Sequence, residues 1–229
     1  PSAALTAVRS DPQLDDAEVE RMVVATTVAP NAVLQRGGAR VVFVTTAGFE
    51  DVPFSGRMDK AELYNLNWKK PKPLTARSDG FGVRERITPD GEVLIPLDEE
   101  SVQDLVEFVR VRLAQSPELS VAVSLLFSYV LPEHEIAIGA ALRDAFPGLP
   151  VSLSHQVTPI WREYERGSTA IADSYVKPIM QNYIAEAVVA FREGGVTAPW
   201  SLMKANGGKN PADAAEAQPN KIGPLYTSD

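Results

Sequence analysis

The residues best suited to chemistry lie in one short stretch, from Ser154 to Tyr175, which reads SHQVTPIWREYERGSTAIADSY. Its centre is an unbroken polar run from Arg162 to Arg166, and His155 lies just upstream. Arginine suits planar recognition of carboxylate, phosphate or carbonyl oxygen, because the guanidinium presents paired N–H donors in a fixed plane. His155 follows an apolar, strand-like segment, which is where α/β folds place functional groups. This stretch is therefore the leading candidate for a functional site.

Two interpretations of the polar run stay open from the residues alone. On a helix, Arg162 and Arg166 would share one face and Glu163 would fall on another. Ion pairs on a solvated helix would produce such a run, and a lone histidine is more often a structural group than a catalyst. The aromatic residues Trp161 and Tyr164 are interleaved with the charges, however, which favours a partly buried recognition surface.

Composition excludes several classes of function. The chain has 229 residues, a net charge of −8, two histidines and no cysteine. The acidic balance speaks against a general nucleic-acid surface. The absence of cysteine excludes disulfides, thiol catalysis and cysteine-ligated zinc, and two histidines exclude a multi-histidine metal site within the chain. The apolar runs are too short for a membrane span and the start shows no signal-peptide pattern, so a cytoplasmic protein is expected.

The elements that must position these residues follow an α/β pattern. Continuous apolar runs at Val41–Val44, Val121–Phe127 and Val151–Leu153 are typical of strands buried in a parallel sheet. Between them, Asp98–Leu113 and Pro132–Phe146 carry helix signals. Helix and strand in alternation predict an α/β fold with a mixed or mostly parallel sheet and flanking helices, the three strands lying in one sheet.

Other segments complete the pattern. Val83–Ile87 and Glu92–Ile95 alternate around a Pro-Asp-Gly turn and predict a hairpin. Pro159–Arg192 is helical in pattern but contains Pro178, so two helices or one kinked helix would satisfy it. From Lys209 onward the composition loses periodicity, which predicts an irregular tail over residues 209–229.

Three weaker candidates for ligand binding lie elsewhere. Thr26 and Thr27, with Asn31 one turn on, could present hydroxyl and amide groups to a ligand, although an ordinary helix cap explains them as well. Arg57 follows a glycine in an irregular segment, and could supply a cation or merely fix the loop. Asn206 opens an Asn-Gly-Gly tripeptide that could let the backbone approach a ligand, although Asn-Gly is above all a turn signal.

Several segments together resemble the hydantoinase A/oxoprolinase family, which includes the ATP-using subunits of ketone carboxylases. The resemblance runs through most of residues 24–208, within a region of that N-terminal type spanning 1–208. The matching segments keep order and spacing: ATTVAPNAVLQRGGARVVFVTTAGFEDV, the Gly56-Arg57 pair, LYNLNWKKPKPL, FGVRERITPDGEVLIPLDEE, LLFSYVLPEHE, LPVSLSHQVTPIWREYERGST and MKANGG.

The resemblance implies a fold, a chemistry and partners. Members are similar to sugar-kinase and actin-like ATPases, and use ATP with Mg²⁺ to activate an amide or ketone oxygen as a phosphorylated imidate or enol. A companion hydantoinase B-type subunit, a hetero-oligomer and a small amide or ketone substrate are expected. The implied site assigns no metal ligand to this chain. Its catalytic residues are His155, Arg162 and Arg166, and its substrate-binding residues are Thr26, Thr27, Asn31, Arg57, Glu163 and Asn206.

The chain also departs from the family pattern. Two Asp- and Gly-rich phosphate hairpins of the family are not found in residues 1–229, so an internal piece of a larger subunit is expected, without tight ATP binding of its own. Val24-Ala25 replace a His-Gly pair of many hydrolytic members, and Tyr64, Asn67 and Trp68 favour a ketone-carboxylase-like member. The leading hypothesis is cyclic-amide hydrolysis; ketone carboxylation and a non-catalytic docking module are the alternatives.

Overall fold

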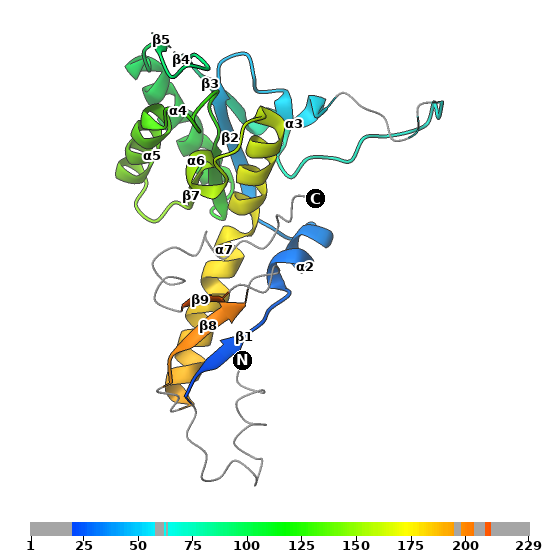
Figure 1. Cartoon of the computed structure of the whole chain (residues 1–229), viewed down its shortest axis with the longest axis vertical. Coiled ribbons are helices and arrows are strands. Elements are labelled where there is room, and N and C mark those ends of the chain that lie inside the picture. The colour runs from blue at the N-terminus through cyan, green and yellow to red at the C-terminus, as the bar shows by residue number, and fades with distance from the viewer. Residues whose placement is uncertain (1–19, 58–61, 63, 195–197, 204–208, 212–229) are drawn as a thin grey trace.

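The fold is an α/β sheet joined by one long helix to a smaller sheet (Figure 1). It was obtained as a computed structural model, which describes residues 20–57, 62, 64–194, 198–203 and 209–211. Asn206 and most of the predicted tail lie outside these residues. In the described part of the chain, no helix is long and apolar enough to cross a membrane.

Within the described residues, four parallel strands form the main sheet in the order β3-β2-β6-β7. The strands are β2 (Arg40–Thr46), β3 (Gly80–Val83), β6 (Leu119–Val123) and β7 (Val151–Leu153). Their apolar residues pair in register, with Val42 beside Val121 and Val121 beside Val151. The predicted placement of three strands in one parallel sheet is confirmed.

Each face of this sheet is covered by helices. On one face, α4 (Glu99–Gln115) and α5 (Glu133–Ala145) pack over Val42, Val44 and their neighbours. On the other face, α2 (Val28–Leu34) and α7 (Glu163–Glu193) pack over Val41 and Phe43. Successive residues of β2 thus pack into the cores on opposite faces of the sheet. This is why the sequence of the strand is a continuous apolar run.

Two predicted boundaries were wrong. The apolar run Val121–Phe127 is a strand only as far as Val123, and Leu125 lies buried in the loop that follows. The segment Val83–Ile87 is divided, because Val83 ends β3 whereas β4 (Arg86–Ile87) pairs antiparallel with β5 (Val93–Ile95). The hairpin itself is therefore confirmed, in a shorter form.

α7 is a single helix despite the proline within it. Pro178 has no N–H, so it cannot donate a hydrogen bond to the carbonyl of Ser174, four residues earlier. The hydroxyl of Ser120 on β6 donates to that carbonyl instead, at 2.8 Å. The strand thereby supplies the hydrogen bond that the helix lacks, and one helix continues through Pro178.

A small sheet lies along the C-terminal half of α7 (Figure 1). In the described residues it has the order β1-β8-β9, formed by β1 (Met22–Val24), β8 (Trp200–Met203) and β9 (Lys209–Pro211). β9 pairs antiparallel with β8, so the first residues of the predicted irregular tail are part of a sheet. Leu202 of β8 is fully buried and belongs to the same core as α2 and α7.

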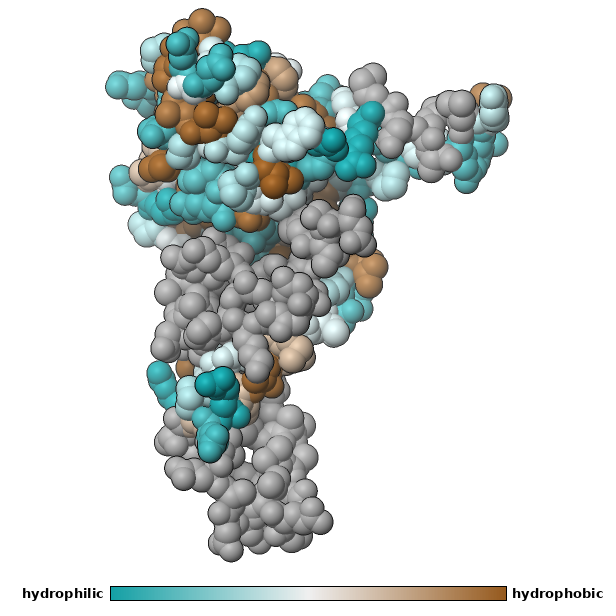
Figure 2. Space-filling view, in the orientation of Figure 1, coloured by the Kyte–Doolittle hydropathy of each residue, from teal (hydrophilic) through white to brown (hydrophobic). Residues whose placement is uncertain are grey.

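Short elements surround the main sheet. α3 (Val52–Ser55) follows β2, the 3-10 helix η2 (Arg77–Asp79) precedes β3, and α6 (Ser154–Val157) follows β7. Apolar side chains gather on the surface at the top of the molecule, over the hairpin (Figure 2), where all three residues of β5 are exposed.

Candidate functional site

Polar side chains gather where the parallel strands end. Thr46 is the last residue of β2, Glu85 comes two residues after β3, and Ser154 and His155 directly follow β7. The carboxyl ends of parallel strands meet at one edge of a sheet, and ligands of α/β proteins bind there. The helices α5 and α7 begin at this edge and add side chains to it. We call this set the carboxyl-edge cluster: Thr46, Glu85, His134, Glu135, Ser154, His155 and Arg166.

Glu135 is the centre of one half of the cluster. Its side chain is fully buried, and one carboxylate oxygen accepts hydrogen bonds from the backbone N–H of Leu125 at 2.9 Å and the hydroxyl of Ser154 at 2.6 Å. The other oxygen accepts the backbone N–H of His155 at 3.1 Å and lies 2.6 Å from its Nδ1. A carboxylate can remain buried in this position because four donors replace its water.

The carboxylate also defines the state of His155. Facing an acceptor, Nδ1 carries the proton, which leaves Nε2 as a lone-pair acceptor in the neutral ring. No group among the described residues hydrogen-bonds Nε2, and 13% of the side chain is exposed. A histidine oriented by a buried carboxylate is suited to accept a proton at Nε2.

Glu85 and His134 form a second pair of the same kind. Nδ1 of His134 lies 2.8 Å from Glu85. The hydroxyl of Thr46 donates to the other oxygen of Glu85 and accepts the backbone N–H of Leu126 at 3.0 Å. The consecutive residues His134 and Glu135 at the start of α5 therefore tie the ends of β2, β3, β6 and β7 together. Sequence reasoning missed Glu85, His134 and Glu135, and the one available signal was a His-Glu pair at a predicted helix start.

Arg166 is held inside the cluster. It is fully buried, and its guanidinium donates to the Ser154 hydroxyl at 3.1 Å and to the carbonyls of Ile160 at 3.1 Å and Leu125 at 2.6 Å. Burial lowers the pKa of Arg166, while Glu163 and Glu135 oppose that shift. Because the ordinary value is so high, the group stays charged at neutral pH.

Arg162 differs from Arg166 in backbone conformation and in exposure. It precedes the first residue of α7 with φ of 80°, a backbone conformation rare for a side-chain-bearing residue. Its side chain is 53% exposed and its guanidinium lies 4.5 Å from the centre of the Trp161 ring. The expectation that Arg162 and Arg166 share a helix face was therefore wrong, because the helix starts between them. The polar run is solvated at one end and buried at the other.

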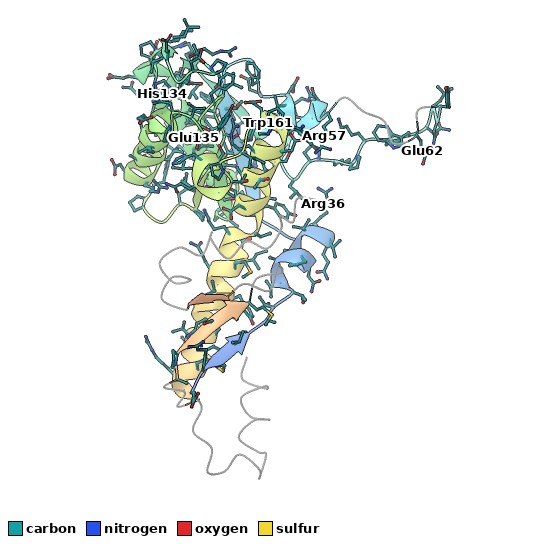
Figure 3. The ribbon with its side chains drawn as sticks, viewed as in Figure 1. Arg36, Arg57, Glu62, His134, Glu135 and Trp161 are labelled. Carbon is teal, nitrogen blue, oxygen red and sulfur yellow. The ribbon has the colours of Figure 1, made fainter. Side chains whose placement is uncertain are left out.

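Acidic residues in the first turn of α7 link the predicted arginines. Glu165 lies 2.6 Å from Arg57 and 3.9 Å from Arg162, and Glu163 lies 3.7 Å from Arg166. Figure 3 places Arg57, at the end of α3, near the start of α7. The structure thus brings together five predicted site residues: Arg57, His155, Arg162, Glu163 and Arg166.

The other predicted binding residues do not join this group. Thr26 accepts the backbone N–H of Val28 at 3.2 Å, and Asn31 donates to the hydroxyl of Thr27 at 3.3 Å. These contacts are those of a helix start. α2 packs against α7 toward the amino ends of the strands (Figure 1), because the chain after it meets α7 at Tyr175. Asn206 lies outside the described residues.

An α/β sheet with a buried polar cluster at its carboxyl edge defines the class of protein, and comparison with known proteins defines the family. The sequence model of the hydantoinase/oxoprolinase N-terminal region matches residues 2–146. The chain therefore belongs to the hydantoinase/oxoprolinase family. The resemblance seen in its sequence motifs is confirmed.

Relatives within this family include enzyme subunits. The chain is 36% identical over 197 residues to the acetophenone carboxylase gamma subunit of Aromatoleum aromaticum, covering 80% of this chain and 26% of that protein. It is 31% identical to the caprolactamase subunit alpha of Pseudomonas jessenii, covering 85% and 28%. The crystal structure of the ATP-dependent caprolactamase of Pseudomonas jessenii superimposes with a TM-score of 0.80 and 29% identity, covering 92% and 31%. The chain thus spans about a quarter to a third of the length of these relatives.

Proposed function

We propose that this chain is part of an ATP-dependent enzyme subunit that activates an amide carbonyl oxygen by phosphorylation, for hydrolysis of a cyclic amide. The observation that carries the proposal is the His155–Glu135 pair at the carboxyl edge, in a fold that superimposes on an ATP-dependent caprolactamase over 92% of the chain. Hydrolysis of an activated amide requires proton transfers from water and to the leaving nitrogen. A carboxylate-oriented imidazole performs both kinds of transfer.

The charged residues around His155 support the same chemistry. Phosphorylating a carbonyl oxygen concentrates negative charge, which fixed cations stabilise. Arg162 and Arg57 are exposed beside this edge, so in our proposal they contact the substrate. Arg166 is fully buried and acts indirectly, because its bonds to Ser154 and Leu125 hold two of the groups that also contact Glu135. Glu163 then limits the net charge beside Arg166.

No group of three or more histidine, aspartate or glutamate side chains among the described residues could hold a metal ion by itself. Mg²⁺ that accompanies ATP is held mainly by phosphate oxygens, waters and one or two carboxylates. We assign none of the described residues as those carboxylates, and propose that ATP and its Mg²⁺ are held elsewhere in the enzyme. We further propose a companion subunit of the hydantoinase B type in a hetero-oligomer, since two relatives are named as subunits. The cytoplasmic location expected from the sequence stays a proposal.

Carboxylation of a ketone is the second candidate. The 36% identity with an acetophenone carboxylase gamma subunit favours it. An enolate oxygen activated by phosphorylation would make the same demand on Arg57 and Arg162 as an activated amide. The two candidates thus differ in substrate and in the second reactant, which is water in one case and bicarbonate in the other.

The assembled enzyme decides between them. ADP release is measured with ε-caprolactam, hydantoin and 5-oxoproline, and with acetone and acetophenone in the presence and absence of bicarbonate. We expect ADP release and a ring-opened acid with at least one cyclic amide. Bicarbonate-dependent ADP release with a ketone would establish the alternative. ADP release with none of these compounds, from an assembly that binds ATP, would support a docking module.

The role of His155 has its own test in the same enzyme. Asn at position 155 can still donate to Glu135 but has no group in place of Nε2, so His155→Asn is expected to lower kcat by about 10²–10⁴-fold with an unchanged melting temperature. Nearly wild-type turnover by His155→Asn would show that the pair is structural. Gln103→Ala, at an exposed position of α4, is the control and should leave kcat within about twofold.

A further inference from the structure

A cleft of about 200 Å³ lies beside the exposed end of the polar run. It is bounded by Pro53 of α3, by the lysine- and proline-rich segment 70–74, and by the first three turns of α7. Its walls are mainly apolar, with Leu74 and Ile171 among them. Small-molecule sites commonly combine such walls with a few well-placed polar groups.

Two hydroxyl-bearing residues line the cleft. Tyr164 and Ser168 both line it and are four residues apart on α7, so they lie on the same face of the helix. Both side chains are half-buried, and no group among the described residues hydrogen-bonds either hydroxyl. A partly buried hydroxyl is stabilised when an acceptor reaches it.

Two lysines give the cleft its charge. Lys70 and Lys72 line it, and none of its lining residues in the described part of the chain is acidic. This is a local reversal in a protein whose net charge is −8. Lys70 and Lys72 therefore favour an anion over a neutral or cationic ligand.

The backbone around the cleft is built to hold Lys70 in place. Its ammonium donates to the carbonyl of Ser55. Gly56 has φ of 55°, and a Cβ at this position would lie 2.6 Å from Nζ of Lys70. The positive φ favours glycine at this position, and a side chain here would in addition displace the Lys70 ammonium from its place beside the Ser55 carbonyl. This accounts for the glycine of the Gly56-Arg57 pair.

Arg36 holds the other part of the segment 70–74. Its guanidinium donates to the carbonyl of Lys72 at 2.7 Å and to that of Pro73 at 3.0 Å. These bonds fix the segment that carries Lys72 before any ligand arrives. A site with its walls in place loses less entropy on binding.

We infer that this cleft binds a small oxyanion, a carboxylate or phosphoryl group, carried on a compact apolar body. The oxyanion accepts hydrogen bonds from Tyr164 and Ser168 and is neutralised by Lys70 and Lys72, and the apolar body lies against Leu74 and Ile171. The inference does not depend on the proposed function, because it uses neither His155 nor ATP.

Isothermal titration calorimetry of the full chain tests it with three probes of similar size. They are cyclohexanecarboxylate, its neutral amide cyclohexanecarboxamide, and phenyl phosphate. We expect one or both anions to bind at least about tenfold more tightly than the amide, since a charge-assisted bond is roughly twice as strong as a neutral one. Which anion binds more tightly identifies the carboxylate or the phosphoryl group as the ligand. Binding of none of the three, or equal binding of the amide, would overturn the inference.

Matched variants locate the binding. Ser168→Ala and Tyr164→Phe each remove one hydroxyl and should weaken anion binding by about three- to tenfold. Lys72→Glu should abolish most of the anion binding. Lys69→Glu makes the same charge change at a neighbouring exposed lysine that does not line the cleft. This control should change the affinity by less than about twofold. Equal loss in both lysine variants, or no loss in any variant of the lining, would place the anion elsewhere.

Discussion

Arg166 shows how one residue can be polar, charged and part of the core at once. Its three guanidinium nitrogens each find an oxygen, from Ser154, Ile160 and Leu125. Such an arrangement depends on the planar fork of arginine, since the ammonium of lysine cannot reach three acceptors that surround a plane. Arg166 therefore differs in kind from Arg162, although they lie four residues apart.

The first prediction compares these two arginines. Arg166→Lys should lower the free energy of unfolding by about 2–4 kcal/mol, because buried acceptors lose their donors. Arg162→Lys should change it by less than about 0.5 kcal/mol, because the side chain is half exposed. Urea unfolding of the two variants measures the difference. Equal midpoints for both would mean that the buried fork is replaceable.

The second prediction concerns a buried ion pair on α7. Lys177 and Asp173 are 5% and 6% exposed and 3.4 Å apart, and both contact Ser152 of β7. Burial lowers the pKa of Lys177 and raises that of Asp173. Lys177→Met leaves the Asp173 carboxylate buried without a cation, which should cost about 3–5 kcal/mol at neutral pH.

The pH dependence of this loss has a definite sign. Removing Lys177 takes away a charge that lowers the pKa of Asp173, so the folded-state pKa rises still further above the unfolded value. The folded state then binds the proton more tightly, and stability returns as the pH falls through that folded pKa. Unfolding at about pH 7 and about pH 5 should show part of the loss recovered in acid. The control Lys177→Met/Asp173→Asn has no carboxylate to titrate at this position, so its stability should not recover in this way. A loss of stability in Lys177→Met that grows at lower pH would contradict the role given to Asp173.

At the scale of elements, the joint between β6 and α7 gives the third prediction. Ser120→Ala removes the donor to the Ser174 carbonyl and should cost about 1–3 kcal/mol. In Pro178→Ala the new backbone N–H can donate to that carbonyl, so Ser120→Ala should cost much less in this background. A double-mutant cycle by denaturant unfolding gives the coupling energy. A coupling near zero would show that the hydroxyl does not replace the helix bond.

The elements also show what the sequence alone could predict. β7 was predicted at its observed bounds, because a proline- and glycine-containing turn precedes it and the polar residues Ser154 and His155 follow it. β3 was not predicted, since Gly80 and Gly82 are poor strand formers. Gly82 is required by packing, because a Cβ there would lie 2.8 Å from the backbone Cα of Ala47. That neighbour is distant in the chain and leaves no local signal.

The same reasoning explains the cluster and the end of β6. A run of apolar residues indicates burial and not strand conformation. The predicted strand therefore extended through Leu125, which is buried, although the backbone leaves the sheet after Val123. His155 and Arg166 were predicted because their types and spacing are visible in one segment. Their partner Glu135 was not, since 20 residues separate it from His155 and helix or strand periodicity pairs only near neighbours.

At the scale of the whole molecule, one core runs through both sheets. Phe43 of the main sheet, Ile184 of α7 and Leu202 of β8 belong to the same buried cluster. A protein built around one continuous helix and a shared core should unfold cooperatively. The small sheet is therefore expected to unfold together with the main sheet.

The fourth prediction tests this continuity. Ile184→Ala should cost about 2–5 kcal/mol, because the side chain is almost fully buried. If the sheets unfold together, native-state hydrogen exchange should show the same loss of protection at Val121 in β6 and at Leu202 in β8. Protection lost at Leu202 and unchanged at Val121 would mean that the small sheet opens independently.

The hydrogen bond between Ser120 and Ser174 lies where a small change in the bend of α7 would displace the far end of the helix. α7 has 31 residues, and the part that follows Pro178 extends for roughly 22 Å at the rise of an α-helix. A change of about ten degrees in the bend at that proline would move the far end, and the small sheet beside it, by about 4 Å. The hydroxyl of Ser120 on β6 bonds α7 at this point of bending. Small adjustments of β6 relative to α7 would thus be magnified at the opposite end of the molecule.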